Sequence, residues 1–430
     1  MSHEQSLETG HNPTVLVQEV GGNLVVLGWR EPRLRARSSD DRLQLRQTEE
    51  AIIVTSAGDC QLYLPVESTL ALAEVHGDLQ VSEVRGAVTV QSCQGNLNLS
   101  QVGATRLERV SGDLAARDVA GELSIDNVAG NASLARVHGR LRVDTCAGDL
   151  AAKEIFGSIA VEHVAGNASI SHGHGDLHIG QCAGDLMLKE LMGAAMVDQV
   201  SGSVAAKEVQ GNLHINHCSG DLRVRGLTGN LHAEISGSAM LKLALASQSR
   251  CWVRAGGDIT CKVPPALDAH VRLESNGELR IKRLPVALER SQGHAEFTVG
   301  AGTGELHLEA DGSIYLSASL DEAAEFQFGP FNVDLDPELQ REMAERASEW
   351  IQQVTEQVER QMEAVSAQLD ARLSQLGSSE EIAARVQQKM AQAMRRAEEK
   401  IAAAVRQAEE RARRAEQRAE RQERRARVYT

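Results

Sequence analysis

A glycine recurs at every ninth residue through the middle of this chain, and this period constrains the fold more than any other feature. Glycines stand at 77, 86 and 95 and then, after one missing residue, at every ninth position from Gly103 to Gly229. Typical units read GDLAARDVA from Gly112 and GNLHINHCS from Gly211. With the glycine as position one, position five is apolar in all 18 units, position three in 17 and position eight in 16. A strict short period indicates stacked structural repeats.

The apolar positions of each unit fit one short β-strand followed by a turn. Positions three and five lie on the same face of a strand, because strand side chains alternate, and position eight is expected to point inward from the next short stretch. Glycine followed by a small polar residue suits a corner with unusual backbone angles. An amphipathic helix is excluded, since the units show no 3.6-residue period. One unit is too small to bury its apolar face alone, so stacking into a parallel β-solenoid is predicted.

The charges at position six indicate how many units form one turn of the coil. Counted over alternate units from Gly103, one set carries bases and no acid, and the other carries acids and no base. A coil of about 18 residues with two nonads per turn keeps each class on its own side, whereas three nonads per turn would mix them. We therefore predict two charged sides as interaction surfaces. The predicted contacts are Lys153, Lys189 and Lys207 on one side and Asp126, Asp144, Glu162 and Asp198 on the other.

Composition and cysteine spacing support the same core. Aromatic residues make up only 3% of 430 residues, so Leu, Val, Ile and Ala must fill the interior, and an aromatic-lined ligand pocket is not expected. Cys93, Cys146, Cys182 and Cys218 all occupy the inward position eight. The last three are two turns apart, about 9.6 Å, which exceeds the reach of a disulfide. We expect free, buried thiols in a reducing compartment.

Net charge and the N-terminal residues bear on location and partners. The formal net charge is −15, and residues 336–430 carry 18 acidic and 18 basic residues, so the whole excess lies in 1–335. An acidic body disfavours nucleic acid as a partner. The N-terminal MSHEQSLETG lacks a signal-peptide pattern, and no apolar run of 18 residues occurs. The expected location is the cytoplasm, with peripheral association at an anionic membrane surface as a further option.

The pattern changes to helical at the pair Asp336-Pro337, which suits a helix N-terminus. Apolar residues then recur at spacings of three and four, and several are eleven residues apart, the period of a nearly straight or right-handed coiled coil. A break is expected at 377–379. A helical hairpin and an oligomeric coiled coil fit the pattern equally. The predicted seam includes Met343, Trp350, Val354, Val365, Leu376, Ile382 and Ile401.

Residues 406–427 contain nine Arg and five Glu. They could contact an anionic surface, or they could form a solvated helix held by Glu–Arg pairs. Interspersed Glu and the lack of aromatic residues favour the solvated helix. The candidates for an anionic contact are Arg413, Arg414, Arg418, Arg421, Arg424 and Arg425.

No motif indicates a catalytic or metal site. The unit SHGHGDLH contains His172, His174 and His178, which are candidate metal ligands, but the corner glycines leave their directions open. His214 and His232 share position four one turn apart, so an exposed histidine ladder is the preferred interpretation. Repeated carboxylates without differentiated neighbours are typical of a binding face. We expect no cofactor, no metal, no small-molecule substrate and no enzymatic activity.

Three segments resemble the bacterial "putative adhesin" family of β-strand repeats, a domain of unknown function. The first is 54–102, which contains CQLYLPVESTLALAEVHGDLQV; the others are 259–281 and 300–318. Such members show a strand ending in L-x-x-P and repeats of G-x-L-x-V-x-x-V. The resemblance covers roughly 14–320 and implies a β-solenoid and a cell-surface role, and some relatives are associated with envelope-stress response.

Together these features predict an all-β solenoid followed by an α-helical hairpin or coiled coil. The expected parts are a disordered N-terminus at 1–13, the solenoid at 14–325 with its regular core at 77–237, a linker at 326–335 and helices at 336–430. The predicted function is a non-enzymatic scaffold that binds protein partners or self-associates through the helices. The alternative is an envelope-stress or membrane-surface binding protein that uses the Arg-rich helix.

Overall fold

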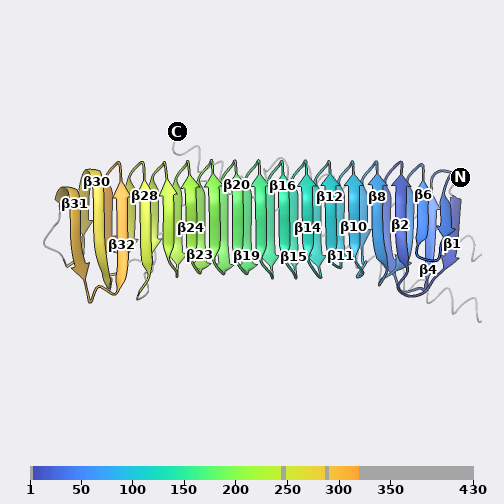
Figure 1. Ribbon diagram of the computed structural model, residues 1–430, viewed down its shortest axis with the longest axis horizontal. Coiled ribbons are helices and arrows are strands. Elements are labelled where there is room, and N and C mark those ends of the chain that lie inside the picture. Colours follow the sequence, from blue (N-terminus) through green and yellow to red (C-terminus); the bar gives the residue numbers. More distant parts are fainter. Residues whose placement is uncertain (1–2, 244–247, 286–289, 319–430) are drawn as a thin grey trace, which may run out of the picture. The chain divides into compact units, whose positions relative to one another are not determined.

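The computed structural model describes residues 3–243, 248–285 and 290–318, and all regular structure within them is β-strand (Figure 1). These strands belong to one compact unit. In this part of the chain no helix is long and apolar enough to cross a membrane. The predicted linker at 326–335 and the predicted helices at 336–430, with their seam and arginine residues, lie outside the described residues.

The strands are short and follow one another closely. The first eleven are β1 (His3–Glu8), β2 (Thr14–Val20), β3 (Leu24–Trp29), β4 (Arg33–Ser38), β5 (Gln44–Gln47), β6 (Ile52–Ser56), β7 (Cys60–Pro65), β8 (Thr69–Val75), β9 (Leu79–Ser82), β10 (Val88–Cys93) and β11 (Leu97–Val102). The next eleven are β12 (Thr105–Val110), β13 (Leu114–Val119), β14 (Leu123–Val128), β15 (Ala132–Val137), β16 (Leu141–Cys146), β17 (Leu150–Ile155), β18 (Ile159–Val164), β19 (Ala168–His174), β20 (Leu177–Cys182), β21 (Leu186–Met192) and β22 (Ala195–Val200). The last eleven are β23 (Val204–Gln210), β24 (Leu213–Cys218), β25 (Leu222–Leu227), β26 (Leu231–Ile235), β27 (Ala239–Leu243), β28 (Arg250–Ala255), β29 (Ile259–Val263), β30 (Ala269–Lys282), β31 (Arg290–Val299), β32 (Gly304–Ala310) and β33 (Ile314–Ala318).

From β8 to β27, each strand pairs in parallel with the strand two places further along the chain. Leu114 pairs with Ala132 and Ala132 with Leu150, so one turn contains 18 residues and two nonads. This confirms the predicted two-sided coil. We call the outer surface of the odd-numbered strands the odd face and that of the even-numbered strands the even face. Lys153 lies on β17 and Asp144 on β16, and these strands belong to different ladders, as predicted.

The core lies between the two ladders and follows the nonad pattern. In β17 the sequence LAAKEI has its first, third and sixth residues buried, which are positions three, five and eight of the unit. The buried hydrophobic side chains of the described region are Val, Leu, Ile, Ala and Cys, and none is aromatic. The low aromatic content therefore follows from the narrow interior of a nonad coil, which γ-branched and β-branched side chains fill.

Close approach of successive turns, not unusual backbone angles, explains most of the position-one glycines, and this corrects the sequence prediction. The Gly130 amide donates to the Gly112 carbonyl oxygen at 3.1 Å. A Cβ on Gly130 would lie 2.6 Å from that oxygen, closer than any side chain tolerates. Of the 18 glycines on the ladder, only Gly175, Gly193 and Gly211 have a positive φ.

A chain of hydrogen bonds, which we call the corner ladder, joins the turns at position two. In each step the backbone amide of one residue donates to the side-chain oxygen of the residue on the neighbouring turn, over 2.7–3.2 Å. Asp alternates strictly with Asn or Ser, so no two carboxylates are adjacent. In spatial order the members are Asp59, Asn23, Asp78, Asn96, Asp113, Asn131, Asp149, Asn167, Asp185, Ser203, Asp221, Ser238, Asp258 and Ser313.

Both ends of the described solenoid depart from the sequential order of turns. Strands β2 and β3 lie between the β6–β7 turn and the β8–β9 turn, and at the other end β32 and β33 lie between β28–β29 and β30. Antiparallel strands follow: β1 on β4, β4 on β7, β5 on β6, and β31 on β30. These strands interrupt the parallel stacking and act as caps. The prediction of disorder over 1–13 is wrong for residues 3–8, which form β1 against β4.

All seven cysteines are buried and free, as predicted for the four at position eight, Cys93, Cys146, Cys182 and Cys218. Burial raises the pKa of Cys93 and of Cys182 to about 11. The Cys182 thiol donates weakly to the carbonyl oxygen of Gly166, at 3.5 Å, so it also contacts the turn next to the corner ladder. These thiols are small core residues with little thiolate at neutral pH.

The alternation in the corner ladder predicts a specific electrostatic cost. Asn131→Asp would place a third carboxylate between Asp113 and Asp149, at about one strand spacing from each. We expect a loss of about 1 kcal/mol of unfolding free energy for each new neighbour at low salt, and a smaller loss in 1 M NaCl. Denaturant unfolding measures it. Asn131→Ser is the control, because it keeps an oxygen acceptor. Equal stability of the two variants at low salt would contradict the interpretation.

Candidate interaction faces

Outward side chains form columns, because the register repeats from turn to turn through most of the coil, with shifts at the β24–β26 and β25–β27 pairings. On the odd face, the predicted Lys153, Lys189 and Lys207 lie in one column at position six. Each ammonium contacts the carboxylate of the next residue in sequence: Glu154 at 3.6 Å, Glu190 at 3.1 Å and Glu208 at 3.4 Å. The lysines are therefore paired with acids along the same face rather than isolated.

A left-handed backbone conformation at position seven of the odd strands makes these adjacent contacts possible. Two consecutive strand residues would normally point to opposite faces. Here position seven has φ of 53–60°, so its side chain turns outward beside position six while position eight still points inward. This conformation is costly for residues other than glycine, and its repetition shows that stacking enforces it. The column contains Glu83, Gln101, Asp118, Arg136, Glu154, His172, Glu190, Glu208 and, with φ of 71°, Gly226.

Ion pairs and hydrogen bonds also run along the odd face between turns. The Arg136 guanidinium forms a bidentate contact with Asp118 one turn away, which lowers the pKa of that carboxyl group. Glu190 accepts from Lys189 and lies 2.8 Å from the His172 Nε2 atom. The Lys189 hydrogen bond, with charge from His172 as a smaller cause, lowers the pKa of Glu190.

On the even face, the predicted acids lie in one column at position six, but their surroundings differ. Asp126 contacts Arg106 at 2.9 Å and Asp144 contacts Arg142 at 2.8 Å. Asp198 lies 3.5 Å from His178 and accepts a hydrogen bond from Asn216 at 3.0 Å. Only part of the predicted acidic column therefore carries uncompensated negative charge. That part lies around Glu162.

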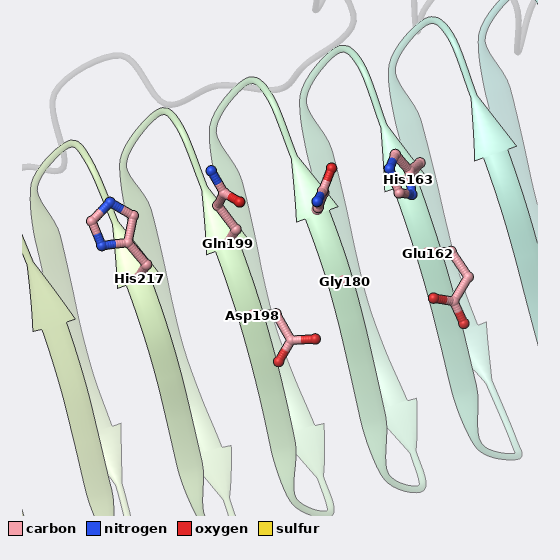
Figure 2. Close-up of a pocket in the computed structure, with 7 residues that line it drawn as sticks. Glu162, His163, Gly180, Asp198, Gln199 and His217 are labelled. Atoms are coloured by element: carbon pink, nitrogen blue, oxygen red, sulfur yellow. The ribbon is translucent and has the colours of Figure 1, made fainter.

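A shallow hollow of about 470 Å³ opens where Gly180 interrupts the acidic column (Figure 2). Glu162 and Asp198 lie on the strands to either side, and no side chain stands between them at that position. The two strands are two spacings apart, about 9.6 Å. The hollow could hold a small cationic group from a partner. Its lining residues are Glu162, His163, Gly180, Gln181, Asp198, Gln199 and His217.

The three histidines considered as metal ligands do not come together. His172 contacts Glu190 on the odd face, His174 stacks on Phe156 at a ring distance of 5.2 Å, and His178 lies on the even face beside Asp198. Over the described ranges, no group of three His, Cys, Asp or Glu side chains could hold a metal ion. These candidate ligands are separated because the chain turns a corner between His174 and His178.

Two columns of stacked rings run along the rod. On the odd side, His138, Phe156 and His174 stack at 5.0 and 5.2 Å. On the even face, His214 and His232 stack at 4.5 Å, as their shared position predicts, and His232 stacks on Trp252 at 4.4 Å. The sequence analysis missed Phe156, which is 45% exposed, because position nine was assigned to a turn.

The basic column of the odd face extends further than the sequence prediction. Strand pairing places Lys207 beside Arg225, Arg225 beside Lys242, and Lys242 beside Lys262. The nonad spacing ends after Gly229. Counting by nine therefore could not find the last two lysines. A search for the outward residue of each later strand could have found them.

Comparisons with known proteins leave the family open. No family model matches the chain, and no curated protein matches it. One similar solved structure is a "putative cell adhesion protein" from Clostridium sporogenes ATCC 15579, with 9% identity and a TM-score of 0.13, covering 74% of this chain and 99% of that one. Another is a "putative adhesin" from Parabacteroides distasonis ATCC 8503, with 10% identity and a TM-score of 0.18, covering 74% and 97%. At these TM-scores neither neighbour identifies a role for this chain.

The stacked His232 ring predicts a pH dependence of stability. Burial, with the neighbouring His214 as a smaller cause, lowers the pKa of His232 below its usual value of 6.5. The unfolded chain therefore binds a proton more readily, so stability is retained above pH 6.5 and falls as pH decreases below it. We expect the unfolding free energy of His232→Gln to fall less than that of the wild type between pH 7.5 and 5.5. The difference between the two losses should be below about 1 kcal/mol in urea unfolding.

The control for this experiment is His11→Gln, which alters an exposed histidine between β1 and β2 and is expected to keep the wild-type pH dependence. If His232→Gln and the wild type lost equal stability on acidification, the stacked ring would make no contribution to the pH dependence of stability.

Proposed function

We propose that this protein is a non-enzymatic interaction scaffold, in which a β-solenoid rod presents charged columns to partners and a helical module associates or docks. The observation that carries the proposal is the corner ladder of 13 consecutive hydrogen bonds, from Asp59 to Ser313. Each turn is fixed by its neighbours on both sides. The outward columns therefore keep a regular spacing over the parallel, stacked turns of the described solenoid.

Such a surface suits recognition, because preorganised side chains lose little freedom on binding. Lys189 and Lys207 are held beside Glu190 and Glu208 by a backbone conformation that repeats on each turn. An extended partner whose binding groups recur at regular intervals along its length matches this geometry best. The rod would thus act as a platform with many weak, equivalent contacts rather than one deep site.

The arrangement of carboxylates supports a role without catalysis. Acid–base chemistry requires groups whose environments differ and whose side chains converge on one reacting atom. Glu162 and Asp198 face open solvent from strands two spacings apart, and Asp126 and Asp144 are each held by an arginine. These carboxylates repeat along a flat face and do not converge.

The thiols support a reducing compartment, and we propose the cytoplasm. Seven cysteines are free, and burial raises the pKa of Cys60 and of Cys261 to about 12. A chain that functions in an oxidising compartment commonly pairs its cysteines.

Residues 336–430 form the second part of the proposal, which rests on their sequence pattern. Met343, Val354, Val365 and Leu376 are spaced eleven residues apart on one helical stripe. We propose that this stripe joins copies of the chain, so that several rods act together and weak contacts gain avidity.

Light scattering coupled to size exclusion tests this proposal on the full chain. We expect the mass of the wild type to be at least twice the chain mass of 46.4 kDa. Val354→Glu combined with Val365→Glu should give the monomer mass, because charges on the stripe oppose packing.

The matched control is Gln352→Glu with Ala367→Glu, which adds the same charge on the opposite side of the predicted helix and should keep the wild-type mass. A monomeric wild type would overturn self-association and favour the helical hairpin. Pelleting of the wild type with anionic liposomes, lost on replacing Arg413 and Arg414 by Glu, would instead favour the membrane-surface alternative.

A further inference from the structure

A ridge of bulky side chains follows one corner edge of the rod, where the odd-numbered strands end. The rings of His138, Phe156 and His174 stack in sequence at 5.0 and 5.2 Å, and the pairing of β19 with β21 places His174 beside Met192. These four residues occupy position nine on four successive turns, and all are exposed. We call them the edge ridge, which is about 14 Å long.

The opposite corner shows that the fold does not require bulky residues at position nine. The residue that follows each even-numbered strand from β12 to β26 occupies this position there, and it is always alanine or serine. The backbone is bonded in the same way at both corners. The amides of Ala147 and Phe156 each donate to a position-eight carbonyl oxygen of the neighbouring turn, at 2.9 and 2.8 Å. Stacking of the turns therefore does not account for the edge ridge.

The edge ridge also holds most of the exposed large hydrophobic side chains of the described residues. Phe156 is 45% exposed and Met192 is 49% exposed. The third such residue, Met196, is 45% exposed and lies on the even face, four residues after Met192 and across the same corner. Large apolar side chains that gather at one edge of a soluble rod indicate an interface.

We propose that the edge ridge packs against the edge ridge of a second copy of this chain, with the two rods antiparallel. The proposal goes beyond the scaffold function, since it requires no contact from residues 336–430. A second copy has the same repeat of about 4.8 Å, so it matches the ridge turn for turn. A two-fold axis between Phe156 and His174 places these two rings against each other and His138 against Met192. Every ridge side chain then has an aromatic or a sulfur–aromatic contact.

The position-seven residues beside the ridge favour antiparallel rods. About the proposed axis, Arg136 of one copy faces Glu190 of the second copy, and Glu154 faces His172. Opposite charges that meet across an interface fix its register. Parallel rods would instead place Arg136 against Arg140 of the second copy, because these two residues lie at equal distances before and after the ridge in sequence.

The ridge ends at Ala120 on one side and at Gln210 on the other, and about the proposed axis these two residues face each other. Beside them Asp118 and Glu208 also approach, but each is held by a base of its own copy, at 2.7 and 3.4 Å. The contact therefore spans about four turns and is one side chain wide. Such a small interface is weak, so it dissociates at the dilution of size exclusion.

A lipid surface fits the ridge less well. Arg136, Glu154 and Glu190 line it, and these charged groups would lose their hydration in a bilayer. An amphipathic helix from another protein would need a groove, whereas the stacked rings form a ridge.

Cysteine cross-linking of the full-length protein tests the register. Ala120→Cys and Gln210→Cys alter exposed positions, whereas the native thiols are buried. Within one copy the two sites are five turns apart, about 24 Å, beyond the reach of a short bismaleimide. A mixture of the two single variants should give a cross-linked dimer, and each variant alone should give none. The same result is expected when Val354→Glu and Val365→Glu are also present.

Sedimentation equilibrium at high protein concentration measures the strength of the contact. The Val354→Glu and Val365→Glu background is used, so that the helical stripe does not join copies. Adding Phe156→Glu and Met192→Glu should weaken association of the rods at least about tenfold.

The matched control is Ala147→Glu with Ala183→Glu, which makes the same change in charge at position nine of the opposite corner, again two turns apart. Its association should stay within about twofold of that of the background protein. Thermal melts check that both variants fold. The milder Phe156→Ala with Met192→Ala places at the ridge a residue that the opposite corner uses, so it should fold normally and still weaken association.

Several results would overturn the proposal: no cross-link in the mixture, a cross-link of Ala120→Cys with itself, or equal association of the ridge variant and its control. Pelleting with liposomes that is lost in the ridge variant would make lipid the occupant. Protection of Phe156→Cys from maleimide in a protein that stays monomeric at high concentration would show that the same chain covers the ridge.

The cross-link and the mass in size exclusion separate this proposal from the scaffold function. If the wild type self-associates but the mixture gives no cross-link, the ridge contact fails and the scaffold proposal stands. If the cross-link forms while the wild type has the monomer mass, the ridge contact stands and self-association through the helices fails.

Discussion

The distance between successive turns at the glycine corner is the constraint on which the rest of the structure depends. The Gly148 amide donates to the Gly130 carbonyl oxygen at 3.0 Å, and a Cβ at Gly148 would lie 2.7 Å from that oxygen. Any larger residue would push the turns apart and break the parallel ladders on both faces. With that spacing fixed, position two of each turn comes within hydrogen-bond distance of the next, and the corner ladder forms. The outward side chains in each column are then separated by the same distance as the turns.

The corner ladder also explains why Asp alternates with Asn or Ser at position two of successive turns. Backbone amides bind the side-chain oxygen of Asp, Asn or Ser, so all three residues satisfy the geometry. Adjacent carboxylates would repel at one strand spacing, and the alternation places a neutral residue such as Asn131 or Ser203 between each pair of Asp residues. Asp59 and Asn23 obey the same alternation although they are out of chain order, because β2 and β3 are stacked between the β6–β7 turn and the β8–β9 turn. Spatial neighbours, not sequence neighbours, determine this pattern.

The regular part of the fold could be predicted because its signal is local and repeated. The period of nine, the inward positions and the opposite sides of Lys153 and Asp144 all follow from alternation and from charge segregation. The ends could not be predicted, since the insertion of β32 between β28 and β30 depends on pairing between segments far apart in sequence. The outward turn of Glu154 was also missed. Its left-handed φ of 58° is imposed by stacking and is not a preference of glutamate.

For the candidate surfaces, residue types were predictable but their environments were not. Position six was correctly assigned to the outside, yet the pairing of Asp126 with Arg106 and the interruption at Gly180 depend on neighbours 18 or 20 residues away. The faces consequently differ along their length. The even face has compensated acids, then a hollow, then stacked rings. On the odd face the column of paired lysines and glutamates continues through Arg225 to Lys242 and Lys262.

Pulsed electron resonance between spin labels at positions 117 and 225 tests the coil most directly. Arg117→Cys and Arg225→Cys lie on β13 and β25 of the odd face, and the buried native thiols should leave only the introduced cysteines open to labelling. The sites are 108 residues apart, which is six turns of 18 residues and predicts a separation of about 29 Å. A coil of 27 residues would place them four turns apart, at about 19 Å, and a distance near that value would contradict the account.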